Sequence, residues 1–160
     1  MMLRPAAPAD IDQLVALAHH PDVAATLATD AADGLATALG VDAGELLVIE
    51  HDDVFVGGVR WVLVNRRSRI ADLRTLMLDP AARGRGLAVA AVRELAGRLF
   101  AARGLHRLEA EVYGFNVPAR RVFERAGFVY EGVRRRAYDR NGDWQDGVRF
   151  GLLDEEFTRS

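Results

Sequence analysis

Residues 76–88 read Leu-Met-Leu-Asp-Pro-Ala-Ala-Arg-Gly-Arg-Gly-Leu-Ala, and this stretch decides the fold. An apolar run typical of a buried strand meets a tight turn at Asp79-Pro80, and a loop with two glycines then leads into an Ala- and Leu-rich helix. The first N–H groups of a helix have no partner inside the helix, and the helix dipole adds partial positive charge there. The loop is therefore predicted to bind a phosphate group.

The side chains of this loop fit the same prediction. Gly84 and Gly86 allow the backbone to approach a ligand closely. Arg83 and Arg85 oppose the helix dipole, so their presence favours an anion bound between them. The alternative is an exposed turn with incidental arginines, because all 21 basic residues are Arg. Two other phosphate motifs are excluded, since Val89 stands where a dinucleotide fingerprint needs a third Gly and the chain has no Lys for a Walker loop.

The segments on either side of the loop predict a mixed α+β domain. Helices are expected at 11–17, 22–40, 87–103 and 116–126, and strands at 3–4, 46–50, 54–64, 70–78, 105–113, 128–138 and 144–153. Asn141-Gly142 predicts a type I′ turn that joins the last two strands. No linker-like stretch divides the chain, so residues 1–160 are expected to form one domain with a mostly antiparallel sheet flanked by helices.

Composition excludes several classes of protein. There is no apolar run of about 18 residues for a membrane span, and the N-terminus does not resemble a secretory signal, which predicts a cytoplasmic protein. The absence of Cys excludes disulfides and thiolate metal sites, and the four His residues lack metal-ligand spacing. Residues 1–53 carry ten acidic residues and one Arg, and the net charge of −2 does not favour nucleic acid as a partner.

Two segments at matching spacing make the sequence similar to a known family, the GNAT N-acetyltransferases. The pyrophosphate loop of that family reads Arg/Gln-x-x-Gly-x-Gly/Ala, which Arg83, Gly86 and Ala88 match in order. Further on, Asn116-x-x-Ala119-x-x-x-Phe123-x-x-x-Gly127-Phe128 resembles the family's second coenzyme segment. The resemblance implies a GNAT-like fold and acetyl-CoA as acetyl donor, with no metal.

The two ends of the chain resemble one branch of this family. Glu131-Gly132-x-x-Arg135, followed by Asn141-Gly142 and Asp146, resembles the tail of the RimJ/RimL-like proteins, and residues 3–10 resemble their first strand and turn. This branch implies a protein or peptide N-terminal α-amine as acceptor, although similar sequences also act on small amines. The exposed last hairpin also suggests a possible homodimer.

The resemblance also implies roles for individual coenzyme-binding residues. Backbone groups of Met77 and Leu78 are expected to pair with the pantetheine arm. The pyrophosphate is expected on the backbone amides of Arg83, Gly84, Arg85, Gly86, Leu87 and Ala88. Asn116 is expected to hydrogen-bond the pantetheine, although Asn also caps helices well by itself. Phe123 is expected beside the thiol end, with a plain core position as the alternative.

Acetyl transfer requires a neutral amine, so a carboxylate should accept the amine proton directly or through water. Asp72 lies eleven residues before Arg83, the spacing at which histone-type relatives carry a Glu base. Glu111 is the alternative base and Glu109 a rival, since residues two apart on a strand share a face. Each of the three is equally explained as a solvated strand carboxylate. A backbone N–H near Leu78 is expected to stabilise the oxyanion, a contribution of about 3 kcal/mol.

One departure from the family affects the second half of the reaction. Many relatives have a Tyr at the position of Phe123, where the hydroxyl protonates the departing thiolate. Here Tyr113, Tyr130, Tyr138 or water would have to protonate the thiolate. Two other hypotheses therefore stay open: a non-catalytic acyl-CoA-binding module or sensor, and an interaction domain that binds RNA through the Arg-rich later part of the chain.

Overall fold

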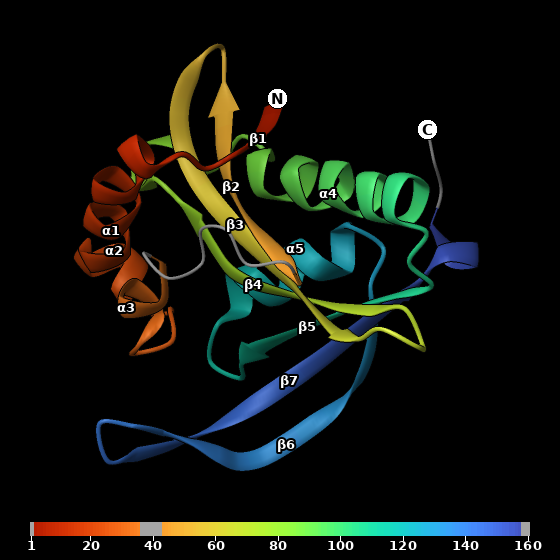
Figure 1. The fold of residues 1–160 in the computed structure, drawn as a ribbon. Coiled ribbons are helices and arrows are strands. Elements are labelled where there is room, and N and C mark those ends of the chain that lie inside the picture. The colour runs from red at the N-terminus through yellow and green to blue at the C-terminus, as the bar shows by residue number, and fades with distance from the viewer. Residues whose placement is uncertain (1, 36–42, 158–160) are drawn as a thin grey trace.

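The structure is a computed structural model that describes residues 2–35 and 43–157 (Figure 1). Its helices and strands follow in the order β1 (Met2–Pro5), α1 (Ile11–His19), α2 (Pro21–Ala24), α3 (Ala31–Leu35), β2 (Gly44–His51), β3 (Val54–Asn65), β4 (Ile70–Leu78), α4 (Leu87–Arg103), β5 (Arg107–Tyr113), α5 (Val117–Arg125), β6 (Val129–Arg140) and β7 (Asp143–Leu153). Short 3₁₀ turns precede α1, follow β4 and follow β7.

Seven strands form one sheet in the order β1-β2-β3-β4-β5-β7-β6. Every neighbouring pair is antiparallel except β4 and β5, which are parallel because α4 crosses over between them. The predicted α+β fold, with a mostly antiparallel sheet flanked by helices, is confirmed. Asn141 and Gly142 have φ angles of 54° and 87°, and these positive values fit the type I′ turn expected between β6 and β7.

The prediction of one helix over 22–40 is wrong within the described residues. The chain forms the short helices α2 and α3 there, and residues 36–40 lie outside the described part. At the end of α2, the guanidinium of Arg140 donates hydrogen bonds to the carbonyls of Ala24, Ala25 and Leu27. These carbonyls lie at the C-terminal end of α2, where no further helical turn in the described part of the chain bonds them, so the contact with the hairpin tip caps the helix.

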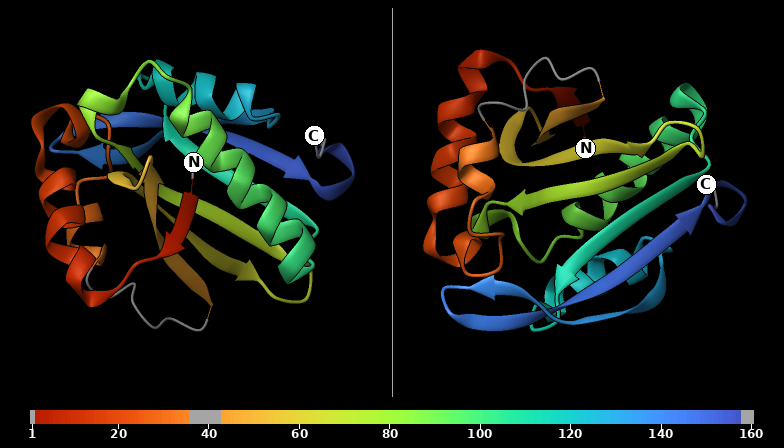
Figure 2. Two further views of the ribbon diagram at one scale, coloured as in Figure 1. Left: turned by 90° about the horizontal axis from the view of Figure 1, so that it is seen from above. Right: turned by 60° about the horizontal axis from the view of Figure 1, so that its bottom comes forward.

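Helices cover both faces of the sheet, and side chains alternate between the two faces along each strand. In β2, Leu47 and Ile49 belong to the apolar cluster under α4 and α5, whereas Leu46 and Val48 belong to the cluster under α1 and α3. Figure 2 shows α4 on one side of the sheet and α1–α3 on the other. The helices of the second group are short, so they leave part of their face of the sheet uncovered.

The sheet opens between its two parallel strands. β4 and β5 pair only over residues 70–73 and 107–110, and no ladder joins the rest of β4 to the rest of β5. Thr75 has a φ of 53°, a conformation that non-glycine residues rarely adopt, and the register of β3 against β4 shifts at the same point. This irregularity turns β4 away from β5. The functional site is built around the resulting opening.

No helix in the described part of the chain has the length and apolarity that a membrane span requires.

Candidate active site

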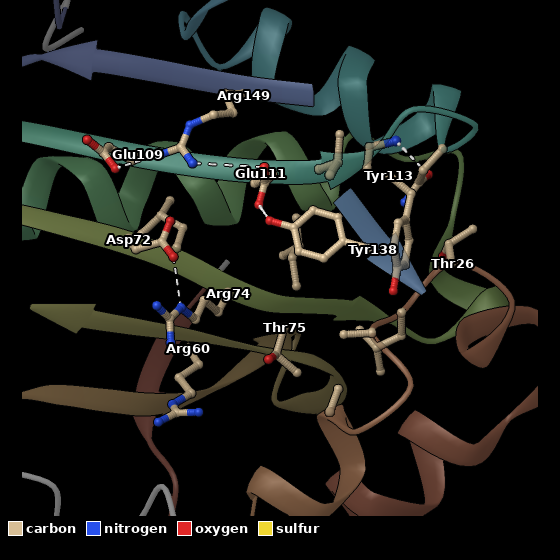
Figure 3. Close-up of a pocket in the computed structure, with 18 of the residues that line it drawn as sticks. Thr26, Arg60, Asp72, Arg74, Thr75, Glu109, Glu111, Tyr113, Tyr138 and Arg149 are labelled. Atoms are coloured by element: carbon tan, nitrogen blue, oxygen red, sulfur yellow. Dashed lines mark hydrogen bonds and ion pairs between the residues drawn. The ribbon is translucent and has the colours of Figure 1, made fainter. Parts of the chain in front are cut away.

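A cavity of about 640 Å³ occupies the uncovered sheet face, next to the opening between β4 and β5 (Figure 3). The segment after α2 and helix α3 form one wall, the sheet forms the floor, and α5 and β6 complete the rim. Its lining residues are Thr26, Leu27, Ala28, Asp30, Ala31, Gly34, Arg60, Val64, Asp72, Leu73, Arg74, Thr75, Leu76, Glu109, Glu111, Val112, Tyr113, Asn116, Ala119, Phe123, Arg134, Tyr138 and Arg149.

Both predicted residues of the second coenzyme segment line this cavity. Asn116 is the N-cap of α5, and its side-chain oxygen accepts a hydrogen bond from the N–H of Ala119 at 3.2 Å. Phe123 is 4% exposed and packs against Phe128 and Phe150, with ring centroids 5.2 and 6.0 Å away. The two roles considered for each residue are therefore compatible, since each has a structural contact and also reaches the cavity wall.

The predicted phosphate loop lies at the other end of the opening, outside the cavity lining. Met77 and Leu78 end β4, a 3₁₀ turn capped by the side chain of Asp79 follows, and α4 begins at Leu87. Gly84 and Gly86 have φ angles of 80° and 72°, and the loop from 83 to 86 is exposed. The first N–H groups of a 17-residue helix therefore face solvent beside glycine backbone, the arrangement that favours a bound anion.

The loop arginines are arranged differently from the expected pair around an anion. Nη2 of Arg83 donates a hydrogen bond to the backbone carbonyl of Asp22 at 3.1 Å, so this side chain is directed toward α2. Arg85 is exposed. Ala88 lies in the first turn of α4, with part of its surface accessible.

The three candidate carboxylates come together on the cavity floor. Asp72 of β4 is the register partner of Glu109 in the parallel strand β5, and Glu111 follows two residues later on the same face. Figure 3 shows all three directed into the cavity, with Glu111 closest to the point where the strands separate. Their surroundings differ, and these differences decide which carboxylate is available to take a proton.

The carboxylates of Asp72 and Glu109 both accept hydrogen bonds from arginines. Oδ2 of Asp72 accepts a hydrogen bond from Nε of Arg74 at 2.8 Å, and burial raises the pKa of Asp72 despite this contact. The carboxylate of Glu109 accepts hydrogen bonds from Arg107 at 3.1 Å and from Arg149 at 3.2 Å. Each of these two carboxylates therefore already has an arginine within hydrogen-bond distance.

The two oxygens of Glu111 differ in their contacts. Its Oε1 accepts a hydrogen bond from the hydroxyl of Tyr138, whereas its Oε2 is buried and accepts no hydrogen bond within the described part of the chain. Nη1 of Arg149 lies 3.9 Å from Oε2, which is ion-pair distance and too long for a hydrogen bond. Burying an acceptor without a partner is unfavourable, and this oxygen lies against Gly147 of β7, where a Cβ would be 2.5 Å from it.

A family model described as the acetyltransferase (GNAT) family matches residues 11–128 of this chain. The chain belongs to the GNAT acetyltransferase family. This result confirms the family predicted from the loop and from the second coenzyme segment. The RimJ/RimL-like branch stays a prediction.

Two proteins of Bacillus subtilis (strain 168) are similar in sequence to this GNAT chain. A probable N-acetyltransferase, YjcK, is 33% identical over 66% of this chain and 58% of that protein. An SPbeta prophage-derived uncharacterized N-acetyltransferase, YokL, is 28% identical over 72% of this chain and 65% of that protein. The chain therefore spans less than two thirds of the length of either relative.

Solved structures support the fold of this GNAT domain. The spermidine N-acetyltransferase from Vibrio cholerae, in complex with CoA and spermine, superimposes with a TM-score of 0.83 over 97% of this chain and 96% of that chain, at 21% identity. A chimera of the same enzyme with hSSAT gives a TM-score of 0.84 at 22% identity. At these identities the likeness concerns the fold.

The tyrosines of this GNAT domain differ in their distance from the cavity. Tyr138 and Tyr113 line it, whereas Tyr130 is 54% exposed and does not. Burial, followed by the contact with Glu111, raises the pKa of Tyr138 to about 12. Its hydroxyl therefore stays protonated at neutral pH and acts as a hydrogen-bond donor.

One contact that fixes the wall of the cavity formed by the segment after α2 has no local pattern in the sequence. Arg140, at the tip of the β6–β7 hairpin, donates to the carbonyls of Ala24, Ala25 and Leu27 at 2.6–2.9 Å. Its guanidinium also lies over the ring of Tyr113, 5.1 Å from the centroid. The two ends of this contact lie more than a hundred residues apart, so no local pattern sets Arg140 apart from the other arginines of the hairpin.

Within the described ranges, no three His, Asp or Glu side chains are grouped closely enough to hold a metal ion.

Proposed function

We propose that this protein transfers the acetyl group of acetyl-CoA to a primary amine, which attacks the thioester directly while both molecules are bound. The observation that carries the proposal is the position of Glu111, whose carboxylate lines a cavity that adjoins the opening between β4 and β5. The strand β4 leads from this cavity to the glycine loop. One extended ligand along β4 could therefore place its thioester at the cavity and its phosphate group at the glycine loop.

The donor is proposed to lie along the end of β4. Beyond residue 73, this strand has no ladder partner on its β5 side, so backbone groups at Met77 and Leu78 are proposed to pair with the pantetheine arm. The backbone amides from Arg83 to Ala88 are proposed to bind the pyrophosphate. Asn116 and Phe123 are proposed to contact the pantetheine and the thiol end from α5. The positive φ of both loop glycines and the exposed helix start support this placement.

Glu111 is proposed as the general base. As the amine nitrogen bonds to the thioester carbon, its proton passes to the carboxylate of Glu111, directly or through water. Asp72 stays an alternative base, and its raised pKa supports proton binding. Arg74 lies 2.8 Å from Asp72, however, whereas the arginines near Glu111 lie 3.9 Å away, so we rank Asp72 below Glu111. Two arginines occupy Glu109 in the same way.

Two negative charges develop during the reaction, on the oxyanion and on the departing thiolate, and both are proposed to be stabilised by groups of this chain or by water. A backbone N–H near Leu78 is proposed to stabilise the oxyanion. When the C–S bond breaks, the CoA thiolate accepts a proton from water or from Tyr113 or Tyr138, the two tyrosines in the cavity. A thiol pKa near 8.5 makes this thiolate a fair leaving group without a strong acid.

The acceptor is proposed to be a small-molecule amine or a protein N-terminal α-amine, as in the RimJ/RimL-like branch. An α-amine has a pKa of about 7.8 and is partly neutral at pH 7, whereas a Lys-like amine near 10.4 depends on a base. We further propose a cytoplasmic enzyme, with a homodimer formed through the edge strand β6. Exposed apolar residues on β6, Val129, Tyr130 and Val133, support the dimer, which sizing in solution would test.

Calorimetric titration with acetyl-CoA tests the donor site. The native chain is expected to bind, and Gly86→Glu is expected to lose binding because it adds negative charge at the anion site. Gly86→Ala is the matched control: at this position a Cβ meets no atom within 4 Å, so it adds only the cost of a positive φ, roughly 1 kcal/mol. Equal binding by both variants would place the phosphate elsewhere.

A screen of amines then tests turnover. Formation of free CoA with any primary amine supports the enzyme. Tight acetyl-CoA binding without turnover on a broad panel would instead identify a non-catalytic acyl-CoA-binding module.

A further inference from the structure

The cavity of this protein carries as many positive as negative side chains. Four carboxylates line it, Asp30, Asp72, Glu109 and Glu111, and so do four arginines, Arg60, Arg74, Arg134 and Arg149. A site that selects a polyamine by charge would need an excess of carboxylate. The acidic first third of the chain does not supply this excess, since Asp30 alone of its described acidic residues lines the cavity.

The arginines are also distributed unevenly. Arg74 contacts Asp72, Arg149 contacts Glu109 and Glu111, and Arg134 lies 3.9 Å from Glu111. Arg60 makes no hydrogen bond or ion pair with any residue in the described part of the chain. It is nevertheless half-buried, and a Cβ built on Gly34 of α3 would lie 3.8 Å from its Nη1. A cation therefore lies on the cavity wall without a counter-charge among the described residues.

Arg60 and Arg74 are register partners on the antiparallel strands β3 and β4. Like charges directly opposite each other on one face destabilise a sheet, and Asp72 compensates only one of these two. Figure 3 shows both guanidinium groups on the same side of the cavity, across from Glu111 and Tyr138. An anion placed between the two arginines would relieve the repulsion and could form paired N–H···O hydrogen bonds.

We propose that the acceptor is a small amine that also carries a carboxylate, an amino acid or a close analogue, with its carboxylate bound by Arg60 and Arg74. This inference rests on the proposed acetyl transfer and specifies its substrate class. The amine then lies on the Glu111 side of the cavity and the carboxylate on the β3 side. Polyamines lack the group that Arg60 requires, and their second cation would lie beside two arginines.

Two amines that differ only in the carboxylate, leucine and isoamylamine, provide the kinetic test. The ratio of their kcat/KM values is measured for the native chain, for Arg60→Met and for Arg66→Met. Arg66 lies in the exposed turn between β3 and β4 and serves as the matched control. The intrinsic difference in amine pKa is the same for every variant, so it cancels from the comparison.

The ratio is expected to fall at least about tenfold in Arg60→Met, the size of effect typical of one charge-assisted hydrogen bond, and to stay unchanged in Arg66→Met. Arg60→Glu is expected to shift the preference toward spermidine. An Arg60→Met variant that folds, acetylates isoamylamine and keeps the native ratio would overturn the proposal.

Binding of the reaction products separates this proposal from the proposed function. N-acetylleucine has the carboxylate and no ammonium, and N-isoamylacetamide lacks both. Calorimetry is expected to show native binding of N-acetylleucine, weakened at least about tenfold in Arg60→Met, and much weaker binding of the neutral amide. Equal affinity for both compounds overturns the carboxylate site whether or not the chain acetylates. Absence of turnover with every amine, beside intact N-acetylleucine binding, would instead count against acetyl transfer alone.

Discussion

The hydroxyl of Tyr138 donates a hydrogen bond to Oε1 of Glu111 and thereby joins β6 to β5 across β7. Gly147 of β7 leaves the room for this contact, since a Cβ there would lie 2.5 Å from Oε2 of Glu111 and 2.7 Å from the Tyr138 ring. The pair therefore fixes the orientation of the carboxylate, whose second oxygen is buried against Gly147.

Replacement of Glu111 is the first test of the reaction. Glu111→Gln is expected to lower kcat on a Lys-like amine about 10²–10³-fold at pH 7, because the amine proton loses its acceptor while the shape of the side chain is kept. The loss should be smaller on an α-amine, which is already partly neutral. Initial rates of CoA release measure both effects.

The loss of activity in Glu111→Gln is compared with the losses caused by replacing the other two carboxylates. Glu109→Gln and Asp72→Asn are expected to cost less than Glu111→Gln, because both side chains are engaged by arginines. A larger loss from Asp72→Asn, again greater for Lys-like amines than for α-amines, would assign the base to Asp72.

Tyr138 should make the stability of the protein depend on alkaline pH. Its pKa is raised from 10 in the unfolded chain to about 12 in the folded chain, so its contribution is fully present below pH 10 and is lost as the pH rises toward 12. Thermal unfolding between pH 9 and 11 is expected to show a steeper fall in Tm for the native chain than for Tyr138→Phe. Parallel curves would show that Tyr138 titrates normally.

Local patterns explain why so much of the fold was predictable. The strand, the glycine loop and α4 each depend on residues close together in the sequence, and Asn116 caps α5 as its residue type favours. The helix error over 22–40 has the opposite origin. Contacts from Arg140 cap the C-terminal end of α2, and no helix-propensity pattern within 22–40 contains information about a hairpin more than a hundred residues later.

The residues of the site could be predicted from the sequence, but the neighbours that contact each of them could not. Spacing alone placed Glu109 and Glu111 on one face, and the structure adds Asp72 beside them. Which carboxylate has a free oxygen depends on Arg149 and Tyr138, contributed by other strands. No local pattern marks Arg60, because the described residues around it come from β4 and from α3.

Arg140 is expected to hold in place the cavity wall formed by the segment after α2. Arg140→Ala removes three hydrogen bonds to the segment after α2, so the acceptor KM should rise severalfold or more while acetyl-CoA affinity changes little. Arg135→Ala, at an exposed position on the same strand, is the matched control. Steady-state kinetics with the acceptor varied at saturating acetyl-CoA measure the effect. Equal rises in both variants would show that charge on the hairpin matters and the contact does not.

Phe123→Tyr tests how the departing thiolate is protonated. Phe123 is buried and lines the cavity, so a hydroxyl added to its ring is expected to reach the proposed thiol end. The kcat should rise below about pH 8.5, where the thiolate benefits from a proton donor, and should approach the native value above that pH. A pH profile of kcat measures the difference, and thermal unfolding checks that the core tolerates the added oxygen. A uniform change across the pH range, or no change in a folded variant, would mean that water or another tyrosine already supplies the proton.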